Sequence, residues 1–136
     1  MKGARARLVL IVEDDKPTGD VLAGAINDER GYRAITAATA DEALAAMSRI
    51  DPDLLLLDIR LPGMSGLELY DRIRADPRFP ALPVVFETGG GREHAQDLRD
   101  RGVATYLKKP FDIHELVKLV KRLVPPRNGD AARKPR

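Results

Sequence analysis

Hydrophobic residues along the chain alternate between short aliphatic runs and longer amphipathic stretches. Leu8–Val12 is a purely apolar run of five residues, a length that no apolar run of the chain exceeds, and Leu54–Leu57 is another run with an aspartate on either side. Runs of this length that are apolar on both faces are typical of strands in the interior of a covered parallel sheet. The pattern predicts five strands, at residues 8–12, 32–37, 53–58, 84–86 and 104–107.

An amphipathic stretch follows each predicted strand and has the apolar spacing of a helix. Thr39–Glu42, Ser65–Glu68 and Asp112–Glu115 have the signature of helix starts, with a capping side chain three positions before a glutamate. The first helix, at residues 17–30, is predicted to bury Val21, Leu22, Ala25 and Ile26, and the last to bury Ile113, Leu116, Val117, Val120 and Leu123. Five strand–helix pairs in series predict a single α/β domain with a doubly wound, five-stranded parallel sheet.

Length and composition narrow the class of protein. The 136 residues are enough for one domain, and 43% hydrophobic with 32% charged residues is a globular composition. An apolar run of five residues is far shorter than the roughly 20 that cross a membrane, and it leads into Glu13–Asp15 rather than a signal-peptide cleavage site. The chain has no cysteine, which excludes disulfides and thiolate chemistry and fits a cytoplasmic location.

Charge is distributed unevenly along the chain. The net charge is +2, but residues 8–124 carry −4 because both ends are basic. We expect a basic N-terminal extension at residues 1–6, a folded domain at 7–124 and a basic flexible tail at 125–136. An acidic body does not indicate direct binding to nucleic acid, and no membrane contact is expected.

Polar residues follow four of the five predicted strands. Glu13–Asp15 follows the first strand, Asp58 ends the third, Thr88 and three glycines follow the fourth, and Lys108–Pro110 follows the fifth. Ligands of open α/β sheets bind beyond the carboxyl ends of the strands. We therefore expect acidic groups, a hydroxyl and an ammonium to meet at one edge of the sheet.

These motifs resemble those of response regulator receiver domains, the CheY-like family of two-component signal transduction. The matching segments are Val12–Asp15, Leu56–Gly66, Thr88 and Tyr106–Phe111, within a similarity that covers residues 7–124. The resemblance implies the strand order 2-1-3-4-5. It also implies a phosphorelay protein that is not an enzyme in the usual sense, since it would catalyse only its own phosphorylation and a slow autodephosphorylation.

The resemblance assigns a role to each site residue. Asp58 would accept a phosphoryl group from a sensor histidine kinase or a histidine phosphotransfer protein. Mg²⁺ would be held by Glu13, Asp14, Asp58 and the backbone carbonyl of Arg60. Thr88 and Lys109 would contact the phosphoryl group, and Thr88 with Tyr106 would switch the face made by the fourth helix, fifth strand and fifth helix. That face would bind a downstream protein or a second copy of the chain.

The chemistry of phosphoryl transfer agrees with these roles. A carboxylate that attacks a negatively charged phosphoryl group must overcome charge repulsion, which a divalent cation and the ammonium of Lys109 would offset. Mg²⁺ prefers oxygen ligands and keeps several waters, so carboxylates and a carbonyl suit it.

Several alternatives stay open from the residues alone. Glu13–Asp15 could complement the dipole of the first helix, and Asp58, Thr88, Tyr106 and Lys109 could each be ordinary structural residues. A dehalogenase-type aspartyl phosphatase would need a second aspartate where Arg60 stands, and a flavodoxin-like protein would need a phosphate loop after the first strand. A receiver that only docks proteins without being phosphorylated is the main alternative function.

Three features depart from the family pattern or find no role in it. Glu87 stands where an apolar residue is common, and Gly89–Gly91 replaces a more varied segment. His94 and His114 have no ligand-like spacing to other residues and are predicted to lie on the surface.

Overall fold

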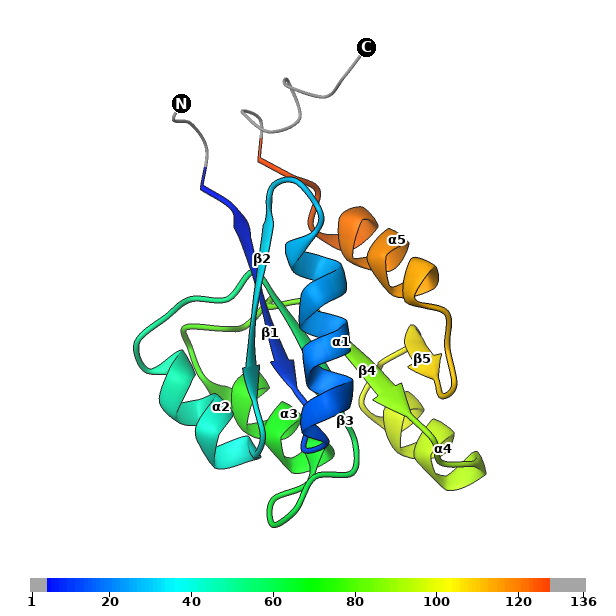
Figure 1. Ribbon diagram of the computed structural model, residues 1–136. Helices are drawn as coiled ribbons and strands as arrows, with labels where there is room; N and C mark the ends of the chain where they lie inside the picture. The colour runs from blue at the N-terminus through cyan, green and yellow to red at the C-terminus, as the bar shows by residue number, and fades with distance from the viewer. Residues whose placement is uncertain (1–4, 128–136) are drawn as a thin grey trace.

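The computed structural model describes residues 5–127, which form a five-stranded parallel sheet flanked by five helices (Figure 1). The strands are β1 (Arg7–Val12), β2 (Tyr32–Ala37), β3 (Leu54–Asp58), β4 (Val84–Thr88) and β5 (Tyr106–Lys108). The helices are α1 (Lys16–Asn27), α2 (Ala40–Met47), α3 (Gly66–Ala75), α4 (Arg92–Asp100) and α5 (Ile113–Leu123). Most of the predicted basic extension and tail, at residues 1–4 and 128–136, lies outside the described residues.

The strand order is β2-β1-β3-β4-β5, as the resemblance implies. All four pairings are parallel, and the register of β1 with β3 places Leu10 beside Leu55. The side chains of β3 are buried along its whole length, so the run of four leucines is the centre of the sheet. Parallel strands reach this burial because each crossover helix covers one face of the sheet.

Two hydrophobic cores lie on opposite faces of the sheet. Helices α1 and α5 cover one face, and α2, α3 and α4 cover the other (Figure 1). Neighbouring residues of one strand serve different cores: Val9 and Ile11 face α1 and α5, while Leu10 and Val12 face the other three helices. This alternation follows from the two-residue period of a strand.

The predicted helix starts are present, with one variation. Ser65 and Asp112 each form a reciprocal capping box with the glutamate three residues later. Thr39 accepts a hydrogen bond from the backbone N–H of Glu42, but the Glu42 carboxylate accepts from Ala38 instead of closing the box.

Some predicted boundaries and core positions are wrong. Helix α1 ends at Asn27 rather than residue 30, and β5 begins two residues later than predicted. Val21 is 60% exposed and Leu123 is 39% exposed, whereas Leu119 is buried. The predicted inner face of α1 is too wide because α1 and α5 are separated by a groove on the side where Val21 lies.

The two ends of the domain meet at the amino-terminal edge of the sheet. The guanidinium of Arg7 donates a hydrogen bond of 2.8 Å to the carbonyl of Pro125, and both Arg7 and Arg127 form ion pairs with Asp53. The hydroxyl of Tyr32 donates to the carbonyl of Val124 at 2.7 Å. Among residues 5–127, no helix is both long enough and apolar enough to cross a membrane.

Candidate functional site

Three carboxylates meet at the opposite, carboxyl-terminal edge of the sheet. Glu13 and Asp14 follow β1, Asp58 ends β3, and each offers an oxygen within 4.8 Å of the other two. Glu13 and Asp58 are buried, and Asp14 is exposed. Within the described part of the chain, Oε1 of Glu13 is buried and receives no hydrogen bond. A cluster of oxygen ligands with an unsatisfied buried member fits a hard divalent cation such as Mg²⁺.

Asp15 differs in function from the two acidic residues before it. Its side chain caps α1 by accepting a hydrogen bond from the backbone N–H of Thr18 at 3.1 Å. That bond lowers the pKa of Asp15, after the larger effect of the Thr18 hydroxyl. The acidic triplet therefore divides into one residue that caps the helix and two that face the cluster.

Asp58 is held in place by its neighbours in the following loop and helix. The backbone N–H of Arg60 donates to Oδ1 of Asp58 at 3.0 Å. A Cβ atom on Gly66 would lie 2.2 Å from the carbonyl oxygen of Asp58. Only glycine allows the start of α3 to approach the end of β3 so closely.

The ammonium of Lys109 lies between three carboxylates. Its Nζ atom is 3.0 Å from Oδ2 of Asp58, 3.4 Å from Oε1 of Glu87 and 3.6 Å from Oε1 of Glu13. Burial lowers the pKa of Lys109, but the hydrogen bond and charge of Asp58 and the charges of the two glutamates outweigh it, so the pKa is raised. The backbone N–H of Lys109, which precedes a cis proline, donates to the carbonyl of Thr88 at 2.7 Å and fixes this loop against β4.

Glu87 is a fourth carboxylate at the site and has no role in the family pattern. It is in register with Asp58 on the adjacent strand and is fully buried. Neither of its carboxylate oxygens receives a hydrogen bond from residues 5–127. Burial raises its pKa to about 8, with Lys109 opposing and the charges of Glu13 and Asp58 adding to the rise. Burial likewise raises the pKa of Glu13.

Thr88 is buried at the end of β4, and its hydroxyl has two partners. The backbone N–H of Gly90 donates to Oγ1 at 2.9 Å, and Nδ1 of His94 lies 2.9 Å from the same oxygen. The sequence predicted that His94 lies on the surface. In the structure it is half-buried, in the first turn of α4. Tyr106 is half-buried on β5, and it lines a cavity of about 310 Å³ together with Thr88.

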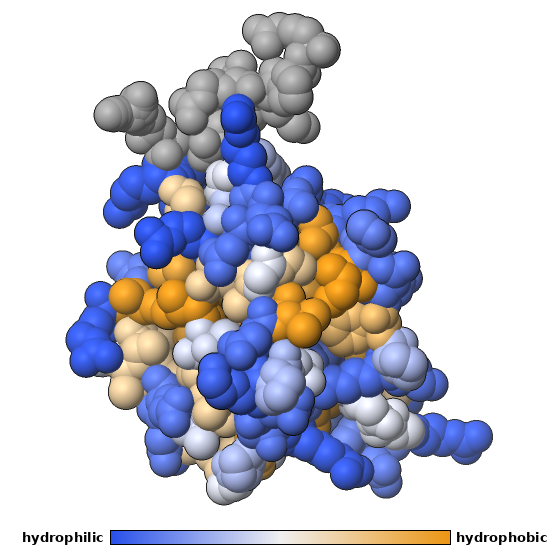
Figure 2. Space-filling view, in the orientation of Figure 1, coloured by the Kyte–Doolittle hydropathy of each residue, from blue (hydrophilic) through white to orange (hydrophobic). Residues whose placement is uncertain are grey.

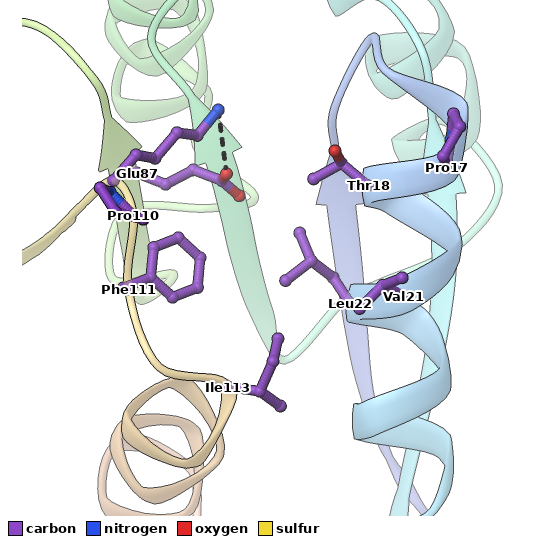
Figure 3. Close-up of a pocket in the computed structure, with 9 residues that line it drawn as sticks. Pro17, Thr18, Val21, Leu22, Glu87, Pro110, Phe111 and Ile113 are labelled. Carbon is purple, nitrogen blue, oxygen red and sulfur yellow. Dashed lines mark ion pairs between the residues drawn. The ribbon is translucent and has the colours of Figure 1, made fainter.

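An apolar groove adjoins Lys109 between α1 and the start of α5. It has a volume of about 580 Å³ and is lined mainly by Val21, Leu22, Pro110, Phe111 and Ile113. Phe111 and Leu22 point toward one another across it, and Glu87 lies at its inner end (Figure 3). Figure 2 shows apolar residues gathered between α1 and α5, and a second apolar group at the left side of the view, on a face that is otherwise largely hydrophilic.

The structure thus brings together the side chains of Glu13, Asp14, Asp58 and Lys109, with Thr88 on the neighbouring strand. Sequence reasoning missed two participants. The burial of Glu87 was signalled only by an acidic residue in a strand that is otherwise apolar. Nothing in its spacing indicated the contact of His94 with Thr88, which spans a glycine loop.

Comparisons with known proteins agree with this architecture. The model of the response regulator receiver domain family matches residues 9–121. The DNA-binding transcriptional regulator NtrC of Salmonella typhimurium is 40% identical over 118 residues, which are 86% of this chain and 24% of that protein. The sporulation initiation phosphotransferase F of Bacillus subtilis is 31% identical over 117 residues, which are 85% of this chain and 93% of that protein.

Solved structures give the same result. A putative response regulator from Chloroflexus aurantiacus superposes with a TM-score of 0.80 at 33% identity, covering 88% of this chain and 98% of that one. The chain spans about a quarter of the length of NtrC-type relatives and most of the length of single-domain ones. Such domains act by accepting a phosphoryl group in two-component signalling rather than as ordinary enzymes. By its sequence, its fold and its matches, the chain belongs to the response regulator receiver domain family.

Proposed function

We propose that Asp58 accepts a phosphoryl group from a sensor histidine kinase or a histidine phosphotransfer protein. The observation that carries this proposal is the contact of 3.0 Å between Asp58 and Lys109 beside the carboxylates of Glu13 and Asp14. In the transfer, a carboxylate oxygen of Asp58 bonds to phosphorus. The bond from phosphorus to the imidazole nitrogen of the donor breaks, and its electron pair stays on that nitrogen.

The residues around Asp58 supply charge and hydrogen bonds to the transferred group. The ammonium of Lys109, which now pairs with the Asp58 carboxylate, would pair with one phosphoryl oxygen after the transfer. The hydroxyl of Thr88 would donate a hydrogen bond to another phosphoryl oxygen. Glu13, Asp14, Asp58 and the backbone carbonyl of Arg60 would hold Mg²⁺. When bound, this ion supplies the positive charge that offsets repulsion between the carboxylates and the phosphoryl group.

The apolar groove would serve as the docking site for the protein that donates the phosphoryl group. It opens next to Lys109, and its exposed edge includes Val21, which is 60% exposed on α1. A partner that delivers a phosphoryl group from a histidine must bring that histidine close to Asp58. A helix with an apolar stripe, laid against α1 and Phe111, would bind there and aim its histidine at the site.

Phosphorylation would then change the face formed by α4, β5 and α5. If Thr88 moves toward the phosphoryl group, the cavity beside it becomes available to the ring of Tyr106. The altered face would bind a downstream protein or a second copy of the chain. Slow attack of water on the acyl phosphate would release inorganic phosphate and restore Asp58.

Incubation with acetyl phosphate tests the proposal directly. In the presence of Mg²⁺, intact-protein mass spectrometry should detect one phosphoryl group on the wild type and on Asp100→Asn, whose carboxylate is exposed on α4. Asp58→Asn, and the wild type with EDTA, should carry none. A wild-type protein that stays unmodified would favour a docking module without phosphorylation, and an adduct on Asp58→Asn would place the acceptor elsewhere.

A further inference from the structure

The hydroxyl of Thr88 is already engaged in the unphosphorylated protein. It lies 2.9 Å from Nδ1 of His94 and receives a hydrogen bond of 2.9 Å from the backbone N–H of Gly90. A threonine hydroxyl has one proton to donate and two lone pairs to accept with. If Nδ1 is unprotonated, Thr88 donates its proton to His94. If Nδ1 carries a proton, both lone pairs are used, so the oxygen is fixed in either case.

The backbone around Gly90 is shaped for this contact. A Cβ atom on Gly90 would lie 1.7 Å from Nδ1 of His94, 2.3 Å from its Cε1 and 2.6 Å from its Cγ. These are the three atoms nearest to such a Cβ, so the space above Gly90 is taken by the imidazole ring. The missing side chain of Gly90 and the hydrogen bond to Thr88 are thus two separate features that place the same ring.

We propose that His94 is a positioning residue that holds Thr88 in its unphosphorylated arrangement and so sets how readily phosphorylation switches the domain. This inference rests on the proposed function, because it requires Thr88 to bond the phosphoryl group on Asp58. For the Thr88 hydroxyl to move toward that group, its contact with His94 must break. The contact therefore stabilises the inactive arrangement against the active one, and it links the start of α4 to the hydroxyl that responds at the site.

Beryllofluoride is a mimic of the phosphoryl group, and calorimetry can measure its binding in the presence of Mg²⁺. The affinity for the mimic reports how strongly the contact of His94 with Thr88 disfavours the active arrangement. The net contribution of a single hydrogen bond is large enough that His94→Ala should bind the mimic about three- to tenfold more tightly than the wild type. His94→Asn keeps a polar amide atom near the position of Nδ1, so it should bind with an affinity close to that of the wild type. His114→Ala, which removes an exposed histidine on α5, should also match the wild type.

Gly90→Ala provides a second, independent route to the same state. Its new methyl group should displace the His94 ring and raise the affinity for beryllofluoride as His94→Ala does. Once His94 is an alanine, adding Gly90→Ala should have little further effect, because the ring that would collide is gone. An equal effect of Gly90→Ala in both backgrounds would contradict the steric link.

The contact itself has a spectroscopic signature that does not depend on affinity. The ¹⁵N chemical shift of His94 Nδ1 should differ between Thr88→Val and the wild type. When beryllofluoride binds the wild type, the signal should move toward the chemical shift found in Thr88→Val. An affinity of His94→Ala that is unchanged or weaker would overturn the inference while leaving the phosphorylation of Asp58 intact. A wild type that neither binds beryllofluoride nor forms an acyl phosphate would overturn the proposed function, and this inference with it.

Discussion

Asp58 and Glu87 lie side by side in register on β3 and β4, and one ammonium, that of Lys109, contacts both carboxylates. The two acids differ in their other partners. Asp58 also accepts a hydrogen bond from the backbone of Arg60, whereas the Glu87 oxygens receive none from residues 5–127. Glu87 is thus a fully buried acid beside a site that is already rich in negative charge.

Glu87→Gln should stabilise the metal-free protein, and more so as the pH rises. Burial raises the pKa of Glu87 from 4.5 to about 8, so the folded protein retains a proton that the unfolded chain has already released. Its contribution to the free energy of unfolding is complete below the unfolded pKa and is lost as the pH rises through the folded one. Urea unfolding in EDTA should show a gain of roughly 2–4 kcal/mol at about pH 8.5 and little gain near pH 5.

Glu93→Gln, an exposed glutamate on α4, is the matched control and should change little across this range. If the gain in stability from Glu87→Gln did not depend on pH, the difference between the two proteins would come from packing rather than from ionisation of Glu87.

Lys109→Met should destabilise the metal-free protein by about 1–3 kcal/mol, because it leaves buried carboxylates without their cation. Lys109 itself is partly exposed, with 32% of its side chain accessible, which places the loss below that of a fully buried pair. Saturating Mg²⁺ should recover much of the loss in thermal unfolding. Lys108→Met, at the exposed neighbouring position, should be neutral. Equal losses for the two lysines would show that charge at the site is not the cause.

Millimolar Mg²⁺ should raise the melting temperature of the wild type, since it binds the folded cluster and not the unfolded chain. Linkage gives about 2.7 kcal/mol when the ion is present at about 100 times its Kd. Glu13→Gln should reduce this gain, because it removes the charge of a buried carboxylate in the cluster whose Oε1 receives no hydrogen bond from residues 5–127. Asp100→Asn should retain the gain. If Mg²⁺ did not change the melting temperature of the wild type, the cluster would be excluded as a Mg²⁺ site.

Val21→Asp should separate docking from chemistry. A charge on the exposed edge of the groove should slow transfer from a phosphorylated histidine phosphotransfer protein by about tenfold, while acetyl phosphate still modifies Asp58 at the wild-type rate. Leu123→Asp alters the other large, exposed apolar residue among those described, away from the groove, and should leave both rates unchanged. Comparable slowing with both donors would indicate damage to the site itself.

Thr88→Ala should disconnect phosphorylation from the α4–β5–α5 face. In the wild type, beryllofluoride should change hydrogen exchange across residues 88–107, because the hydroxyl would leave His94 and Tyr106 would gain space. The variant should still bind the mimic, more weakly, without that change in exchange. The same exchange pattern in the variant and the wild type would assign the switch to another residue.

Topology made most of the site predictable from sequence. Because parallel strands end at one edge, an acid after β1, an acid at the end of β3 and a lysine after β5 had to converge, and they do. The burial of Glu87 was not predictable in this way. It depends on the path of the Lys109 loop, which folds back onto β4 through the hydrogen bond from Lys109 to Thr88.

Helical spacing failed for Val21 for a related reason. Periodicity identifies an apolar face but not how far the neighbouring helix extends over it, and α5 leaves that edge of α1 uncovered. The contact of His94 with Thr88 crosses a loop whose shape depends on glycine. No spacing rule for a strand or a helix describes such a contact.

The pairing of Arg7 with Pro125 and of Arg127 with Asp53 has a practical consequence for handling the protein. Both contacts lie at the amino-terminal edge of the sheet, and the six residues of β1 place the acidic cluster roughly 20 Å away at the other edge. A surface tether or a fluorescent label attached beyond Arg127 would therefore start from the pole opposite Asp58. Immobilised in that orientation, the domain would present its acceptor, its groove and the loop before α4 to the solution, where phosphodonors can be exchanged over it.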